Sequence, residues 1–218
     1  MAEMSRANSV PTRTYVSPKR QEQARATRRA IVGAAKRLFL QDGYGPTSIR
    51  AVAGEAGVAV QTVYAVFGNK RQLLIELIED AVTGDEDTMV TARSEALAIR
   101  AEPSPRRRAE MNAALSRAIV ERVLPIWTIT MNAAAIDPEF VEVNQAMVAR
   151  RWAEMPGAAA ILAGDEGRLR VSPEEAAASL FVLYSPGVAQ TLTEYLGWSF
   201  DRYEKWLADA IERLILNT

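Results

Sequence analysis

Apolar residues recur at helical spacing along most of the chain, and no segment sustains the alternation that is typical of a half-buried strand. Two of the clearest stripes cover residues 21–41 and 199–216. Capping side chains followed by proline, at Ser104, Asp137 and Ser172, mark three further helix starts, because proline is tolerated at the first helical position. The pattern predicts an all-α fold of about nine helices.

Prolines predict the interruptions of these helices. Pro125 is expected to separate two helices, Pro156 to kink or break one, and Pro186 to kink a helix over residues 172–196. Residues 1–20 are polar and aperiodic, and we expect them to form a disordered basic arm. The chain has no run of 18 apolar residues and no apolar leader, so the expected location is cytoplasmic, with no membrane partner.

The chain contains no cysteine and no histidine. This composition excludes disulfides, thiolate or imidazole metal sites, cysteine nucleophiles and the Ser-His-Asp relay. Carboxylate chemistry remains open, since Glu139, Glu142, Glu174 and Glu175 are near one another in sequence. All four lie at helix starts, where capping and the helix dipole account for acidic residues. We therefore expect no enzyme activity, no metal and no cofactor.

Charge is divided unequally between two parts of the chain. Residues 1–72 contain 12 basic and 4 acidic residues, a net charge of +8, whereas the remainder carries −9 and the whole chain −1. A basic unit of this kind is suited to a polyanion, although a solvated basic face has the same composition.

Residues 48–67 have the spacing of a helix-turn-helix. A small residue, Ala53, is followed four positions later by Gly57, which suits a left-handed turn, and then by the β-branched Val63. Ala53 allows the second helix to cross closely above the first, and Val63 fills the space between them. The combination, inside the basic segment, predicts a DNA-binding motif.

Residues 28–78 resemble the DNA-binding domain of the TetR (tetracycline repressor) family of transcriptional regulators. The match includes Ile31, Ala35, Leu38, Phe39, Gly43, Tyr44, Thr47, Ser48, Ile49, Ala56, Gly57, Val58, Thr62, Val63, Tyr64, Phe67, Lys70, Leu73 and Leu74. The resemblance implies a helix-turn-helix domain over residues 21–70 and a helical ligand-binding and dimerisation domain over residues 71–218. Its implied partners are operator DNA, a small-molecule effector and a second copy of the chain.

The resemblance also implies DNA-contacting residues. Thr47 or Ser48 would cap the second helix and bind a phosphate, and Tyr64 and Lys70 would contact phosphates. Gln61 is the expected base reader, because its amide can pair bidentately with adenine. Ala59 stands where the family usually has Ser, so the recognition helix is expected to lack its side-chain cap. The full expected set is Thr47, Ser48, Arg50, Val60, Gln61, Thr62, Tyr64 and Lys70.

The C-terminal part supplies candidates for an effector site and a dimer interface. Aromatic and Met residues favour an apolar or aromatic effector, although the same residues at helical spacing also suit a plain core. The candidates are Trp127, Met131, Asn132, Phe140, Met147, Trp152, Phe181 and Tyr184 for the ligand, and Leu192, Tyr195, Leu196, Trp206, Ala210 and Leu214 for the dimer. The function expected is a ligand-responsive repressor; the alternative is a dimeric helical scaffold with a degenerate helix-turn-helix.

Overall fold

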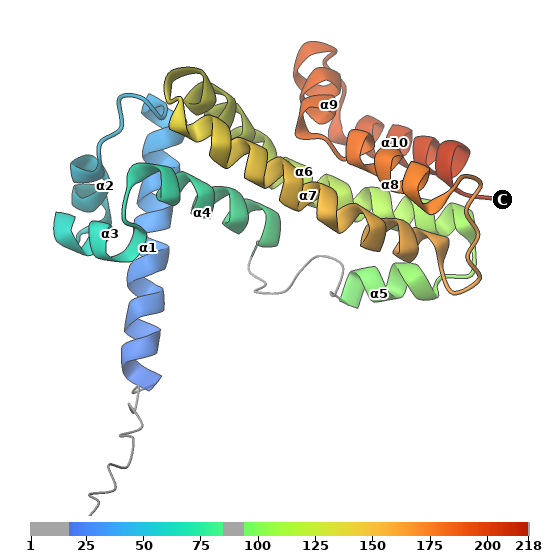
Figure 1. Cartoon of the computed structure of the whole chain (residues 1–218), viewed down its shortest axis with the longest axis horizontal. Helices are drawn as coiled ribbons and strands as arrows, with labels where there is room; N and C mark the ends of the chain where they lie inside the picture. Colours follow the sequence, from blue (N-terminus) through green and yellow to red (C-terminus); the bar gives the residue numbers. More distant parts are fainter. Residues whose placement is uncertain (1–17, 85–93, 218) are drawn as a thin grey trace, which may run out of the picture.

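The structure is a computed structural model that describes residues 18–84 and 94–217. Within these residues it contains ten α-helices, one π-helical turn and no β-strand, which confirms the all-α prediction. Helices α1–α4 form one end of the molecule, α5, α8 and α10 lie toward the other, and α6 and α7 run side by side between them (Figure 1). The elements are α1 (Pro18–Asp42), α2 (Ile49–Ala56), α3 (Val60–Phe67), α4 (Lys70–Thr83), α5 (Ser94–Ala101), α6 (Pro105–Ile136), α7 (Glu139–Ala163), α8 (Pro173–Leu183), α9 (Pro186–Gln190), the π-helical turn Thr191–Tyr195 and α10 (Phe200–Ile215).

Capping side chains begin α6 and α8 at Ser104 and Ser172, as the sequence predicts. The N-cap predicted at Asp137 is wrong, because Pro138 is the N-cap of α7 and makes no side-chain cap bond. Asn69 Oδ1 accepts from the backbone N–H of Gln72 at 2.8 Å at the start of α4, and Ser104 caps α6 in the same way. Ser172 and Glu175 form a capping box at α8, and Ser199 caps α10. Each cap satisfies a backbone donor that has no partner inside its helix.

The separation of two helices expected at Pro125 is absent, and Pro156 does not break its helix. Both prolines lie inside continuous helices, α6 and α7, with exposed side chains. A proline in a helix interior costs about 3 kcal/mol. Burial of neighbouring residues, such as Leu124 and Ile126 around Pro125 and Met155 beside Pro156, offsets this cost.

The helix expected over residues 172–196 is instead divided into α8, α9 and the π-helical turn. Ser185 has extended backbone angles, φ −64° and ψ 128°, and Pro186 begins α9. The physical cause is the proline ring, which disfavours the helical conformation of the residue before it. Pro186 therefore breaks this segment rather than kinking a single helix.

The N-terminal boundary and α5 also differ from expectation. Helix α1 already begins at Pro18, so residues 18–20 are helical, because proline is compatible with a first helical turn. The rest of the arm expected over residues 1–20 lies outside the described residues. Helix α5, which the sequence reading missed, is short, and only Ala96 and Ile99 on it are buried.

Two hydrophobic clusters meet along α6. One joins the buried faces of α1–α4 to the C-terminal half of α6, and the other joins the N-terminal half of α6 to α7, α8 and α10. Helix α4 shares its core with α1 and α3 but also packs on α6, so the domain boundary expected after residue 70 stays a prediction. Among the described helices, only α6 is long and apolar enough for a membrane span, which is weak evidence because core helices pass the same test.

Candidate functional site

Helices α2 and α3 form the helix-turn-helix that the spacing predicts. Ala53 and Val63 are each 1% exposed, where the two helices pack together. Gly57 ends α2 with φ 67° and ψ 31°, the left-handed conformation that glycine adopts without steric cost. The small, flexible and β-branched residues thus occupy the positions that the motif requires.

The outer face of α3 presents polar side chains to solvent. Tyr64 is 52% exposed, so it is not part of the hydrophobic core. Gln61 is exposed beside it, as is Arg50 on α2, whereas Val60 and Thr62 are half-buried. Ala59 makes no side-chain cap, as expected. This exposed surface can meet a DNA groove without rearrangement of its core.

Thr47 and Ser48 have different roles. Ser48 caps α2, since its Oγ accepts from the backbone N–H of Ala51 at 3.1 Å, and its side chain is exposed. Thr47 is 4% exposed, and its hydroxyl donates to the Gly43 carbonyl at 2.8 Å. A phosphate can therefore reach Ser48 but not the Thr47 hydroxyl, because the latter is buried and already bonded.

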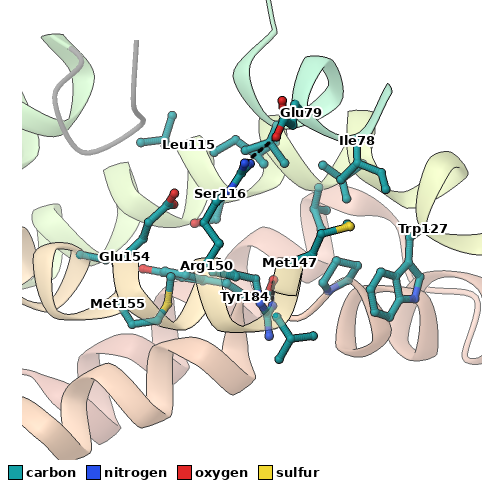
Figure 2. Close-up of a pocket in the computed structure, with 18 of the residues that line it drawn as sticks. Ile78, Glu79, Leu115, Ser116, Trp127, Met147, Arg150, Glu154, Met155 and Tyr184 are labelled. Atoms are coloured by element: carbon teal, nitrogen blue, oxygen red, sulfur yellow. Dashed lines mark hydrogen bonds and ion pairs between the residues drawn. The ribbon is translucent and has the colours of Figure 1, made fainter. Parts of the chain in front are cut away.

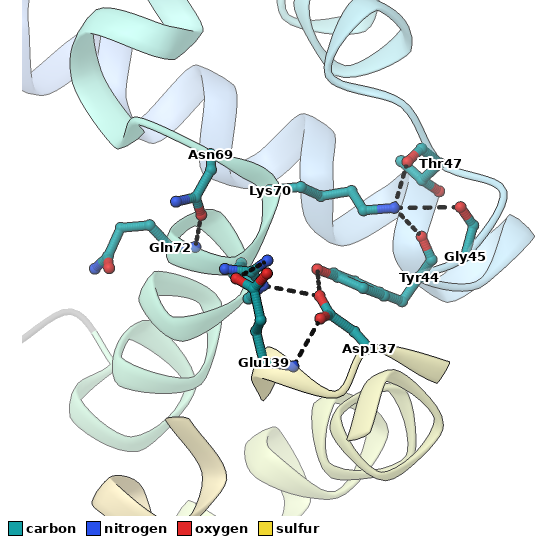
Figure 3. A network of polar contacts seen from close by, with 9 residues as sticks. Tyr44, Gly45, Thr47, Asn69, Lys70, Gln72, Asp137 and Glu139 are labelled. Carbon is teal, nitrogen blue, oxygen red and sulfur yellow. Dashed lines mark hydrogen bonds and ion pairs between the residues drawn. The ribbon is translucent and has the colours of Figure 1, made fainter. Parts of the chain in front are cut away.

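Lys70 binds the loop between α1 and α2 (Figure 3). Its ammonium donates to the carbonyls of Tyr44 at 2.8 Å, Gly45 at 3.2 Å and Thr47 at 3.1 Å, and it lies 4.2 Å from the centre of the Tyr44 ring. Burial lowers the pKa of Lys70, partly opposed by the charge of Asp137. An ammonium has three donors, so the expected phosphate contact would require Lys70 to give up one of these bonds.

Asp137 joins the helix-turn-helix end to the C-terminal helices (Figure 3). Its Oδ2 accepts from Arg71 Nε at 2.9 Å and from the Tyr44 hydroxyl at 3.4 Å, while Oδ1 accepts from the backbone N–H of Glu139 at 3.2 Å. Arg71 also pairs with Glu139 at 2.5 Å. The hydrogen bond from Arg71 lowers the pKa of Asp137, and burial with the nearby Asp137 raises the pKa of Tyr44 to about 12.

A cavity of about 250 Å³ lies within the C-terminal helices (Figure 2). Its walls come from α4, α5, α6, α7, α10 and the α8–α9 junction, and most of its lining is apolar. Arg150 Nη1 and Glu79 Oε1, 2.5 Å apart, form an ion pair between α7 and α4 at its edge. A site of this size and composition suits a small, mostly apolar molecule.

Three of the expected ligand residues line this cavity: Trp127, Met147 and Tyr184. The other five do not. Met131 and Asn132 are exposed on α6, because they lie on its outward-facing side. Phe140 is fully buried in the core beside Tyr44. Trp152 and Phe181 pack edge to face with each other outside the cavity.

Two polar residues of the cavity wall, Asn112 and Ser116, were not predicted from the sequence. The Tyr184 hydroxyl donates to Asn112 Oδ1, and Ser116 also hydrogen-bonds this hydroxyl. Asn112 and Ser116 are four residues apart on α6, so they share one face of the helix. The available signal was a pair of polar residues at this spacing inside the apolar stripe of α6.

The residues expected at a dimer interface divide into two groups. Tyr195, Leu196 and Leu214 are 73%, 60% and 52% exposed. The other three, Leu192, Trp206 and Ala210, are partly buried against the C-terminal core. The three exposed residues thus remain available to a second copy.

Two of the four glutamates considered for enzyme chemistry have structural partners. Glu139 pairs with Arg71, and Glu175 belongs to the capping box with Ser172. The described residues contain no cluster of three acidic side chains that could hold a metal ion.

Comparison with known proteins gives a match to a family model over the N-terminal helices. Residues 31–77 match the family model of bacterial regulatory proteins of the tetR family, which spans α1 to α4. No curated protein matches the chain.

Solved structures match nearly the whole chain. NalD, the secondary repressor of the MexAB-OprM multidrug efflux pump in Pseudomonas aeruginosa, is 25% identical, with a TM-score of 0.63 over 90% of this chain and 98% of NalD. The SmeT–triclosan complex is 21% identical, with a TM-score of 0.63 over 88% of this chain and 92% of SmeT. A candidate regulator from Saccharomonospora viridis, in complex with choline, is 21% identical, with a TM-score of 0.61 over 88% of this chain and 98% of that protein.

Proposed function

Because residues 31–77 match the model of bacterial regulatory proteins of the tetR family, we propose that this chain is a repressor that a small, mostly apolar ligand releases from its operator. Regulators of this family are DNA-binding transcription factors rather than enzymes. NalD is a repressor, and SmeT was solved with triclosan, a small aromatic compound; both support extending these two properties to this chain.

The observation that carries the proposal is the position of α4. Its first residues, Lys70 and Arg71, hold the α1–α2 loop and Asp137, while Ile75, Ile78 and Glu79 line the cavity. A ligand that displaces α4 would therefore move the helix-turn-helix as well. The ligand shifts the equilibrium only by the difference between its affinities for the two arrangements.

The proposed DNA surface consists of α3 and the start of α2. Gln61 reads a base, Tyr64 binds a phosphate, and Ser48 and Arg50 contact the backbone. Their exposure supports these roles. Thr62 and Val60, which are half-buried, would contribute at the edge of the groove. We assign Lys70 a positioning role, because its three donors bind carbonyls.

The proposal includes a cytoplasmic homodimer, because one recognition helix reads only a few base pairs and two copies read two half-sites. The exposed Tyr195, Leu196 and Leu214 support an interface near the C-terminus. Sedimentation of Leu214→Glu should show dissociation, whereas Leu97→Glu, at an equally exposed leucine on α5, should stay dimeric. Nothing in the described residues favours the alternative of a scaffold that no longer reads DNA.

A reporter experiment tests the proposed function. The promoter of the protein's own gene drives a fluorescent reporter, and the protein is supplied from a second promoter. Repression should lower the signal, and a panel of apolar and aromatic compounds should contain members that restore it. An unchanged signal on expression of the protein would contradict repression.

A further inference from the structure

One hydroxyl on the cavity wall has no hydrogen-bond partner. Tyr203, on α10, lines the cavity and is 0% exposed, yet its hydroxyl makes no hydrogen bond within the described part of the chain. A buried polar group without a partner is costly, and native structures rarely keep one without a reason. Because Tyr203 is one of the residues that line the cavity, a ligand bound there is the candidate partner.

The neighbouring polar groups already satisfy one another. Tyr184 donates to Asn112, and Ser116 hydrogen-bonds the Tyr184 hydroxyl. Burial raises the pKa of Tyr203 to about 12, so its phenol is neutral and keeps its proton at physiological pH. Tyr203 therefore offers an O–H donor that has no acceptor within hydrogen-bond distance among the described residues.

The rest of the lining limits the charge and polarity of a ligand. Its charged side chains are two glutamates and two arginines, whose formal charges balance: Glu79, Glu154, Arg150 and Arg151. Arg150 is paired with Glu79, and Arg151 donates to the Phe181 carbonyl at 3.1 Å. Apolar side chains such as Ile78, Trp127 and Met147 form most of the remaining wall.

We propose that the cavity binds an uncharged, mostly apolar ligand with an acceptor oxygen, such as an aryl ketone, and that Tyr203 donates to that oxygen. This inference rests on the proposed function, because it names the ligand class of the same cavity. Tyr203 then acts as a specificity-determining residue: it distinguishes ligands that carry an acceptor oxygen from hydrocarbons of the same shape.

Two probes of matched shape test the inference. Benzophenone has one carbonyl acceptor, and diphenylmethane replaces that carbonyl with a methylene group. Their affinities are measured by displacement of the fluorescent probe N-phenyl-1-naphthylamine from the full chain and from Tyr203→Phe. Diphenylmethane is the control ligand, because it fills the same space and cannot accept a hydrogen bond.

Tyr203→Phe should weaken benzophenone binding about fivefold and leave diphenylmethane binding unchanged. In the infrared spectrum, the carbonyl stretch of bound benzophenone should lie at lower wavenumber in the wild type than in Tyr203→Phe, because a hydrogen bond weakens the C=O bond. The spectrum of the wild type against free benzophenone gives this comparison even if Tyr203→Phe does not fold.

The inference would be overturned if Tyr203→Phe lost affinity equally for both probes or for neither. An unshifted carbonyl stretch would overturn it as well. None of these measurements uses DNA. A negative result with the probes therefore contradicts the role of Tyr203 and leaves intact the proposed function, which the reporter tests. A negative result with the reporter contradicts the proposed function and leaves the probe result valid.

Discussion

Arg71 Nε donates to Asp137 Oδ2 at 2.9 Å, and this bond joins the first turn of α4 to the turn between α6 and α7. The two residues are far apart in sequence but belong to the two ends of the molecule that the proposed function couples. The Tyr44 hydroxyl approaches the same carboxylate at 3.4 Å. Asp137 thus bonds both to the loop before α2 and to α4, one of the helices that line the cavity.

Substitution Asp137→Asn should weaken the coupling between ligand and DNA. An amide removes the charge that holds Arg71, so α4 can move with less effect on α6 and α7. The ratio of operator affinities without and with ligand should fall by a factor of about 2 to 30. Fluorescence anisotropy with labelled operator measures this ratio. Asp165→Asn, which loses an exposed ion pair to Arg100, is the control, and an equal fall in both variants would refute the role of Asp137.

The same carboxylate gives a pH prediction. The hydrogen bond from Arg71 holds the pKa of Asp137 below its ordinary range, near 3.9 in an unfolded chain. The stability that this carboxylate contributes is therefore complete above about pH 4 and is lost as the pH falls through the lower, folded-state pKa. In urea unfolding, the free energy of unfolding of the wild type should exceed that of Asp137→Asn by a constant amount from about pH 6 to 8. This excess should shrink below about pH 4. A difference that disappears near neutrality would contradict this assignment.

Gln61→Ala should relax base preference at one operator position. Gln61 is exposed on α3, so the substitution should leave the free energy of unfolding nearly unchanged. The best site should lose about 1–3 kcal/mol of discrimination at that position, since a bidentate pair to the base is removed. Binding to a library of operator variants measures the preference. Gln145→Ala, at an exposed glutamine on α7, should leave it unaltered, and an unchanged profile for Gln61→Ala would exclude base reading.

Lys70→Ala should destabilise the loop before α2 rather than remove a phosphate contact. Loss of the hydrogen bonds to three carbonyls should lower the free energy of unfolding by about 1–2 kcal/mol. The slope of log affinity against log salt should stay the same, because no released counterion depends on Lys70. A slope smaller by about 0.9, at unchanged stability, would instead assign Lys70 to a phosphate.

Local signals predicted most of the fold. The caps at Asn69, Ser104 and Ser199 form within a few residues, so the sequence specifies them directly. The glycine turn at Gly57 is equally local. Interruption at Pro125 was predicted wrongly, because the penalty is local while the burial that offsets it comes from distant helices.

The site was less predictable for the same reason. The Lys70 ammonium binds carbonyls 23 to 26 residues away, and Asp137 meets Arg71 across 66 residues. No spacing rule connects such pairs. The exposure of Tyr64 and Gln61 followed from the helix-turn-helix pattern, whereas Met131 and Trp152 were assigned to a ligand site on residue type alone. Residue type does not fix which face of a long helix meets a cavity.

Fluorescence anisotropy on DNA from upstream of the protein's own gene tests the central claim most directly. The full chain is titrated, at about 0.1 M salt, against that DNA and against random DNA of the same length and composition. The account predicts binding to the upstream DNA at least about 1,000-fold tighter than to the random sequence. Equal affinity for the two DNAs would contradict the claim that this chain is a sequence-specific regulator of its own region.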